Sequence, residues 1–295
     1  TIDFIEIATT GNATDFADLS QSRRPSAGIS SSTRGVTMGG FTPSIVTTVD
    51  FITMASQGAA TDYADLETAM RDSAGVSNSV KGFNCGGSTP TVQNVIQNVT
   101  IASGGTFSDF GDLTYSRTAV GGSSNSHGGL NDGYQGTRPL PFNEAGGDQG
   151  LYGGGSPSLN TIDFIKISST GNANDFGNLS VGRRQFQSVG NKIKGVFGGG
   201  YGTPANRNIL DYVSHSTKGN AADFGDLTIT RVAGAGAGNN TRGIFAGTES
   251  PGVGNSIEYI TINTLGNAAD FGDRTVSNFA TMPTNNNVRG VMQGG

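Results

Sequence analysis

The sequence predicts an all-β protein, a six-bladed β-propeller made of four-stranded blades. Three observations lead to this prediction. A five-residue motif recurs six times, four strand-like segments accompany each copy, and the two chain ends carry complementary parts of one blade. A repeat of about 40–50 residues that contains four short strands is typical of a propeller blade.

The motif reads aspartate, aromatic residue, small residue, aspartate or asparagine, and usually leucine. Its aromatic positions follow one another at intervals of 47, 47, 66, 48 and 47 residues: Phe16, Tyr63, Phe110, Phe176, Phe224 and Phe271. The aspartates that precede them are Asp15, Asp62, Asp109, Asp175, Asp223 and Asp270. A feature present in every copy is most simply explained by the fold, so we interpret this motif as structural.

The fourth copy illustrates the four predicted strands. Residues 161–167 alternate apolar and polar side chains, residues 175–181 carry the motif, residues 183–189 are rich in small side chains, and residues 194–197 precede three glycines. Small residues suit the innermost strand, where the blades converge, and bulky residues suit the rim. The repeats cover about 1–46, 47–93, 94–160, 161–208, 209–255 and 256–295 of a single domain, 1–295.

The chain ends predict how the ring closes. Residues 2–7 read as the third strand of a blade, and residues 289–292 read as a second strand. Joined in one sheet, the two ends complete a sixth blade and avoid an unpaired sheet edge. Because the chain begins at Thr1 inside a strand pattern, we also expect a processed product or part of a longer chain.

Two further features are similar to the kelch repeat. Glycine pairs end most of the second strands: 39–40, 86–87, 154–155, 199–200 and 294–295. An arginine follows the aromatic residue by seven positions at Arg23, Arg117, Arg183 and Arg231, with Met70 and Asn278 in the other copies. The chain resembles a short glycine-rich kelch variant without tryptophan, like the propellers of tailed-phage tail and fibre proteins and of secreted bacterial proteins. That resemblance implies an extracellular or virion-surface location.

Composition excludes several classes of function. The net charge of −5 argues against nucleic acid as a partner, because phosphate binding needs a basic face. No apolar run of 18 residues is present, so we expect no membrane insertion. The single cysteine, Cys85, excludes an internal disulfide and is expected to be buried. The glycine pairs lie between strands without a following helix, so they are not phosphate loops, and we expect no cofactor.

The sequence also lacks the marks of a catalytic or metal centre. His127 and His215 fall at different repeat positions, and no cluster has zinc-ligand spacing, a nucleophile elbow or a triad. The repeated aspartate pairs could bind calcium, but we expect them to form turns or accept backbone N–H bonds instead. Carboxylates from different blades could still form a glycosidase pair.

The long interval between Phe110 and Phe176 marks the place where the repeat symmetry breaks. It contains 19 extra residues, 66 minus 47, within about 124–148. Function in repeat scaffolds usually lies in such variable loops. Aromatic and hydrogen-bonding side chains in this segment are the predicted ligand-binding residues: His127, Asp132, Tyr134, Arg138, Phe142 and Glu144. The alternatives are a decorative loop and a contact between subunits.

Together these observations favour a non-catalytic extracellular or virion-surface binding or adhesion module. The kelch-like resemblance implies a phage tail-associated propeller for host attachment. The expected partners are a cell-surface glycan or protein, other tail proteins, or further copies of the chain in a homo-oligomer. One alternative is a structural subunit that assembles into an extracellular fibre, filament or appendage through its faces and loops. A glycan-active enzyme is the third alternative.

Overall fold

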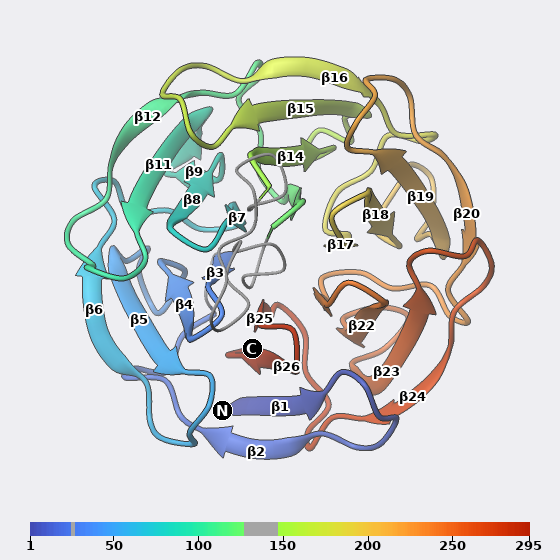
Figure 1. The fold of residues 1–295 in the computed structure, drawn as a ribbon, viewed down its shortest axis with the longest axis horizontal. Coiled ribbons are helices and arrows are strands. Elements are labelled where there is room, and N and C mark those ends of the chain that lie inside the picture. Colours follow the sequence, from blue (N-terminus) through green and yellow to red (C-terminus); the bar gives the residue numbers. More distant parts are fainter. Residues whose placement is uncertain (25–26, 127–146) are drawn as a thin grey trace, which may run out of the picture.

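The computed structural model of the protein describes residues 1–24, 27–126 and 147–295. Six four-stranded antiparallel sheets stand as blades around a central channel, which confirms the predicted six-bladed β-propeller (Figure 1). The described residues form no helix, and therefore none that is long and apolar enough to cross a membrane.

In each blade the strands are ordered from the channel to the rim. Blade 1 contains β3 (Ala27–Ser30), β4 (Arg34–Met38), β5 (Thr48–Thr53) and β6 (Thr61–Asp65). Blade 2 contains β7 (Ala74–Ser77), β8 (Lys81–Cys85), β11 (Val95–Thr100) and β12 (Ser108–Asp112), with a small hairpin of β9 (Ser88–Thr89) and β10 (Thr91–Val92). Blade 3 contains β13 (Gly121–Ser124), β14 (Gln149–Gly153), β15 (Thr161–Lys166) and β16 (Asn174–Asn178).

The second half continues the pattern. Blade 4 contains β17 (Gln187–Gly190), β18 (Lys194–Gly198), β19 (Ile209–Ser214) and β20 (Ala222–Asp226). Blade 5 contains β21 (Ala235–Gly238), β22 (Arg242–Thr248), β23 (Gly254–Thr261) and β24 (Ala269–Asp273). The sequence repeats are offset from the blades, because residues 161–208 supply β15 and β16 to blade 3 but β17 and β18 to blade 4.

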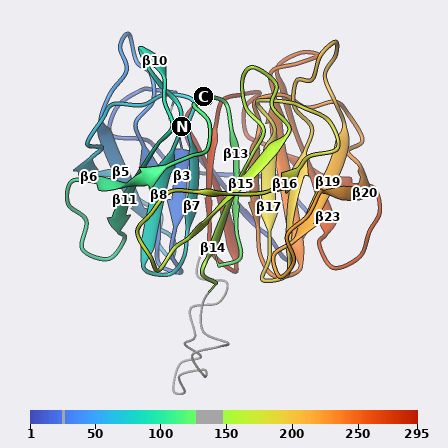
Figure 2. The same ribbon diagram turned by 90° about the horizontal axis from the view of Figure 1, so that it is seen from above.

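Blade 6 closes the ring from both chain ends, as predicted. It contains β25 (Met282–Asn285), β26 (Arg289–Gln293), β1 (Ile2–Glu6) and β2 (Thr14–Ala17). Strands β1 and β26 pair over five residues, from Ile2 opposite Gln293 to Glu6 opposite Arg289. The blade is therefore hydrogen-bonded across the junction between the first and last residues of the chain, and the termini meet on one face (Figure 2).

The disc has two faces. The hairpin face carries the turns between the first and second strands of the blades. The link face carries the chain segments between blades and also β9, β10 and both termini (Figure 2). On the link face, backbone N–H groups join successive blades: Ala119 to the Asp72 carbonyl, Gln185 to Ala119, Ala233 to Gln185, and Ala280 to Ala233. These five residues all have a left-handed φ of 51–58°.

The motif aromatic residues lie in the outermost strands, at the rim (Figure 1). Five of the six are at most 4% exposed, and Tyr63 is half-buried. Most contact an aromatic residue of the third strand, as in the pair Phe164–Phe176, whose ring centroids are 6.1 Å apart at 71°. Such edge-on pairs stabilise the rim beyond the area they bury.

The motif aspartates do not behave as expected. All six first-position aspartates are exposed, and no backbone N–H of a described residue donates to a motif carboxylate. The motif instead joins neighbouring blades through its backbone. The N–H of Asp112 donates to Asn172 Oδ1 at 3.1 Å, and the N–H of Gly171 donates to the carbonyl of Phe110. The expectation failed because the side chains point outward while the backbone edge meets the next blade.

This inter-blade clasp explains the small residue of the motif. A Cβ on Gly111 would lie 2.6 Å from the carbonyl oxygen of Gly171. Glycine occurs at four such junctions, each opposite a glycine–asparagine pair: Gly111 with 171–172, Gly177 with 219–220, Gly225 with 266–267, and Gly272 with 11–12. The other two junctions have Ala17 and Ala64, and the facing loops there lack the asparagine. The motif glycine and the asparagine of the facing loop are therefore both present at four junctions and both absent at the other two.

Buried ion pairs fasten the link segments to the blades. Five arginine–carboxylate pairs have side chains that are at most 3% exposed: Arg23–Asp50, Arg117–Asp163, Arg183–Asp211, Arg231–Glu258 and Arg274–Asp3. Burial lowers the pKa of Arg183, and the Asp211 carboxylate opposes that shift. A hydroxyl satisfies the carboxylate further, since Ser180 Oγ donates to Asp211 at 2.7 Å. The link therefore enters the core, and β17 begins at Gln187 rather than near Arg183 as expected.

Two copies that lack the motif arginine are compensated. In blade 2, Met70 stands at the arginine position and Gln97 at the acid position, so both charges are absent together. Blade 6 has Asn278 at the arginine position, and Arg274 reaches Asp3 from the position that holds leucine in the other motifs. Its Nη2 lies 3.2 Å from the Asp3 carboxylate.

Cys85 is fully buried on β8, as the sequence predicted. Burial raises the pKa of its thiol well above the usual value, so the reactive thiolate is scarce near neutral pH. We expect no alkylation by iodoacetamide at pH 8 in the folded protein and full alkylation in denaturant, measured by intact mass. Rapid labelling of the folded protein would contradict the buried position.

Candidate functional site

The predicted ligand-binding residues lie outside the described residues. His127, Asp132, Tyr134, Arg138, Phe142 and Glu144 all fall within 127–146. The structure therefore leaves that prediction untested, and it describes only the base from which the insertion leaves the propeller. Of the two histidines, His215 is the one described.

The insertion replaces the tight turn between the first two strands of blade 3. Residues 125–148 separate β13 from β14, where residues 78–80 alone separate β7 from β8. The base keeps the geometry of the short turns. Asn125 Oδ1 accepts the N–H of Gln149 at 3.1 Å, as Asn78 Oδ1 accepts the N–H of Lys81 at 2.7 Å. The insertion is thus carried by an ordinary hairpin.

A pocket lies beside this base on the hairpin face, between blades 3 and 4. It spans about 530 Å³ including the open solvent at its mouth, and it is lined by Asn125, Asp148, Gln149, Phe164, Ile165, Lys166 and His215. His215 Nδ1 and Gln149 Oε1 are 3.0 Å apart across the junction between the blades. Asp148 accepts hydrogen bonds from the N–H and hydroxyl of Ser168. We call this site the junction pocket.

The junction pocket occupies repeat positions that are structural elsewhere. The residue after the third strand is apolar and buried in the other blades (Ile7, Met54, Ile101, Ile167 and Ile262), but it is His215 in blade 4. The first residue of the second strand is basic in the other blades (Arg34, Lys81, Lys194, Arg242 and Arg289), but it is Gln149 in blade 3. These two exceptions face each other, so the break in symmetry is local and paired.

In other blades, the basic residue at the position of Gln149 forms a hydrogen bond to the next blade. Arg34 donates to the carbonyl of Ile101 at 3.0 Å, and Arg289 donates to the carbonyl of Met54 at 2.9 Å, each reaching the next blade. Such charge-assisted bonds are stronger than neutral ones. We call this hydrogen bond from a basic side chain to the next blade the clamp. At the junction pocket, the neutral amide of Gln149 opposite the imidazole of His215 replaces it. Gln149 stays partly exposed at the pocket, whereas His215 is only 8% exposed.

The chemistry of the junction pocket suits a polar ligand. Phe164 is half-buried and forms an apolar wall, with Lys218 Nζ 4.3 Å from its ring centroid. Lys166 Nζ lies 3.9 Å from the Asp148 carboxylate, and both are partly exposed. A few convergent polar groups beside an apolar wall is the usual form of a small-molecule site. Among the described residues, no group of three or more His, Cys, Asp or Glu could hold a metal ion.

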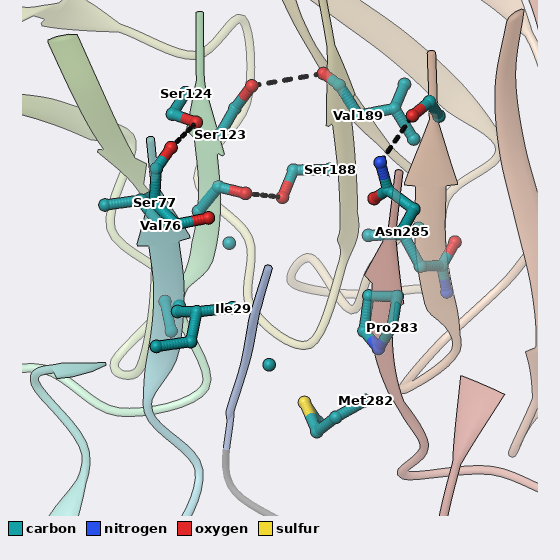
Figure 3. Close-up of a pocket in the computed structure, with 18 of the residues that line it drawn as sticks. Ile29, Val76, Ser77, Ser123, Ser124, Ser188, Val189, Met282, Pro283 and Asn285 are labelled. Carbon is teal, nitrogen blue, oxygen red and sulfur yellow. Dashed lines mark hydrogen bonds between the residues drawn. The ribbon is translucent and has the colours of Figure 1, made fainter. Parts of the chain in front are cut away.

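The central channel is a second cavity, which spans about 760 Å³ including its open ends. It is lined by the innermost strands, whose small residues were predicted (Figure 3). Its hydroxyls join neighbouring strands: Ser77 Oγ donates to the Ser30 carbonyl at 2.9 Å and Ser124 Oγ donates to the Ser77 carbonyl at 2.6 Å. Asn285 similarly donates to the Gly238 carbonyl at 2.6 Å. These polar groups therefore form hydrogen bonds between the innermost strands of neighbouring blades.

The sequence did not single out the junction pocket, although one signal was present. Comparing repeats position by position would have shown His215 at an otherwise apolar position and Gln149 at an otherwise basic one. The sequence comparison alone does not show that these two residues face each other, because their contact depends on which blades are adjacent.

The architecture thus defines the chain as a six-bladed β-propeller in which Gln149 and His215 depart from the repeat pattern together at the junction of blades 3 and 4. Comparison with protein-family models finds none that matches the chain, and comparison with curated proteins likewise gives no match.

Proposed function

We propose that this protein is a non-catalytic binding module of an extracellular or virion surface, and that the junction pocket and the adjoining insertion hold its ligand. The observation that carries the proposal is the paired exchange of Gln149 and His215 at the foot of the insertion. The exchange replaces a charge-assisted bond between blades and a buried aliphatic residue by a neutral hydrogen bond between Gln149 and His215, which is the weaker link. Ligand binding accounts for both replacements at the place where the chain also gains 21 turn residues, 24 in place of three.

The ligand class that fits best is a cell-surface glycan. The amides of Asn125 and Gln149 and the carboxylate of Asp148 can hydrogen-bond to sugar hydroxyls, while Phe164 offers an apolar wall. This chemistry agrees with the resemblance to glycine-rich kelch-like propellers of phage tails and secreted proteins, in which host attachment is the expected role. We therefore propose a host-attachment function for the hairpin face.

Two variants test the proposal on a glycan array. In the first, residues 125–148 are replaced by the Asn-Ser-Val turn of residues 78–80. In the second, Gln149→Lys and His215→Ile restore the repeat pattern. Both are expected to keep the far-UV circular dichroism spectrum and to lose glycan binding at least tenfold. Lys194→Gln, which removes the clamp at the next junction, is the control and is expected to bind normally.

Undiminished binding by both variants would refute the junction pocket as the site. Release of shortened glycans during the assay would favour a glycan-active enzyme over a binding module.

A structural subunit remains the second candidate, and a separate observation favours it. Exposed apolar residues occupy the same turn position on the hairpin face of blades 2, 4 and 6: Val80 (54% exposed), Ile193 (58%) and Val288 (55%). Exposed apolar groups at related positions can form contacts between copies. Light scattering at increasing concentration separates the candidates, because a fibre subunit grows in mass while a binding module keeps one mass. Replacing all three residues with threonine is expected to abolish such growth.

A further inference from the structure

The link face carries a row of alternating arginine and aromatic side chains across blades 6, 1 and 2. In order around the ring they are Phe279, Arg24, Phe41 and Arg71. Arg24 Cζ lies 5.0 Å from the Phe279 ring centroid, and Arg71 Cζ lies 5.8 Å from that of Phe41. We call these four residues the arginine–aromatic arc.

The backbone fixes the middle of the arc. Arg24 and Phe41 exchange two backbone hydrogen bonds, of 3.0 and 2.8 Å, in an isolated antiparallel bridge. Arg71 is held by Nε, which donates to Ser88 Oγ at 3.1 Å. The two guanidinium groups are thus presented by paired backbone segments, which lowers the entropy that a ligand would otherwise have to remove.

The arc is open to solvent. Phe41 is 40% exposed, the Arg71 side chain is 44% exposed, and Arg24 is exposed. Stacking on a ring occupies the flat face of a guanidinium and leaves its in-plane N–H donors available. The side chain of Arg24 donates no hydrogen bond to a described residue. The Arg71 guanidinium therefore lies over the exposed ring of Phe41. The backbone bridge holds Arg24, which stacks on Phe279, next to Phe41 in the chain pairing.

Among the described residues, the acidic side chain that faces the arc is Asp72. The Asp72 carboxylate lies 3.9 Å from Arg71 Nε, and both Arg71 and Arg24 act on it electrostatically. The corresponding described residues of the other links are uncharged: Ala119, Gln185, Ala233 and Ala280. Asp72 is thus a local counter-ion that an anionic ligand would have to displace or share.

Blade 4 offers a natural comparison. Arg184 stacks on Tyr201, with Cζ 4.8 Å from the ring centroid, at the positions that Arg24 and Phe41 occupy in blade 1. The next link has Val232 where Arg71 stands, so this pair has no second arginine. The same backbone bridge occurs there, but its one arginine stacks on the aromatic residue of its own bridge.

We propose that the arginine–aromatic arc is a second binding site, specific for a carboxylate-bearing sugar residue of an acidic glycan. A guanidinium binds a carboxylate through two parallel N–H bonds, and Phe41 can pack against the apolar face of a sugar ring. Two arginines beside the Asp72 carboxylate leave one net positive charge at the arc, which matches the one carboxylate of a uronic acid residue. This site lies on the face opposite the junction pocket and does not depend on it.

The test is isothermal titration of the whole protein with an oligogalacturonate and with its methyl ester. The oligogalacturonate is expected to bind and the ester to bind at least tenfold more weakly, because esterification removes the charge. Arg24→Ala and Arg71→Ala are each expected to weaken binding about tenfold or more. Arg184→Ala is the matched control and should leave binding unchanged. Asp72→Asn should strengthen binding, since it removes the competing carboxylate and asparagine tolerates the left-handed φ of 55°.

Three results would overturn the proposal: no binding of the oligogalacturonate, equal binding of the ester, or normal binding by both arginine variants. Circular dichroism and the melting temperature show that each variant is folded. The variant Gln149→Lys with His215→Ile should bind the oligogalacturonate normally, so that failure of the arc and failure of the junction pocket are distinguishable.

Discussion

Replacing Asp211 with asparagine is expected to lower the free energy of unfolding by about 3–5 kcal/mol. The Asp211 carboxylate accepts from Arg183 at 3.1 Å and from Ser180, and both partners of the ion pair are almost fully buried. Asparagine preserves the volume but leaves the Arg183 guanidinium as a buried charge without a counter-ion. Urea denaturation followed by far-UV circular dichroism measures the loss. A decrease below about 1 kcal/mol would show that the pair contributes little.

Blade 2 supplies the matched control for this prediction. It folds with Met70 and Gln97 where the other blades have charges, so a neutral pair fits the same surroundings. The double variant Arg183→Met, Asp211→Gln copies that solution into blade 4. We expect it to recover most of the stability lost by Asp211→Asn, because removing both charges also removes the cost of desolvating them. A double variant less stable than the single one would mean that blade 4 requires the charges themselves.

The acid partner of each arginine could have been found in the sequence. The acids lie 13 residues before the motif aromatic residue in five copies (Asp3, Asp50, Asp163, Asp211 and Glu258), and the sixth copy has Gln97 there. Gln97 occurs in the same blade as Met70. The arginine position and the acid position therefore lose their charges together within one chain. The compensation in blade 6 was harder to foresee, because Arg274 stands at a different repeat position from the arginines it replaces.

Local patterns predicted the fold well because each propeller strand is short and packs mainly on its neighbours. The alternation in residues 161–167 and the glycine-rich inner segments were enough to place strands and to order them from channel to rim. The junction pocket was not predictable in the same way. Asn125, Gln149, Phe164 and His215 come from separate segments, and they meet only because blades 3 and 4 are adjacent. The residues proposed from sequence, within 127–146, adjoin this pocket along the chain.

Replacing Gly177 with alanine is expected to cost about 2–3 kcal/mol of stability. Gly177 has a φ of 153°, and a Cβ there would collide with the backbone carbonyl of Gly219 in the next blade. Relief of the collision would move the loop away and stretch the 3.1 Å bond from the Asn178 N–H to Asn220 Oδ1. Thermal melting by circular dichroism measures the effect. Ala17→Gly, at a junction that already accommodates alanine, is the control and should change stability by less than about 1 kcal/mol.

The two junctions that contain alanine indicate how the loss of stability in Gly177→Ala can be reduced. Ala17 and Ala64 face loops without the asparagine, so a loop freed from that bond can stand farther from the motif. Asn220→Ala alone should destabilise the protein by losing one hydrogen bond, about 1 kcal/mol. In a double-mutant cycle, Gly177→Ala with Asn220→Ala should cost less than the sum of the single changes, because the released loop no longer resists the methyl group. Strict additivity would mean that glycine and asparagine act independently, and the clasp would then be two unrelated contacts rather than one unit.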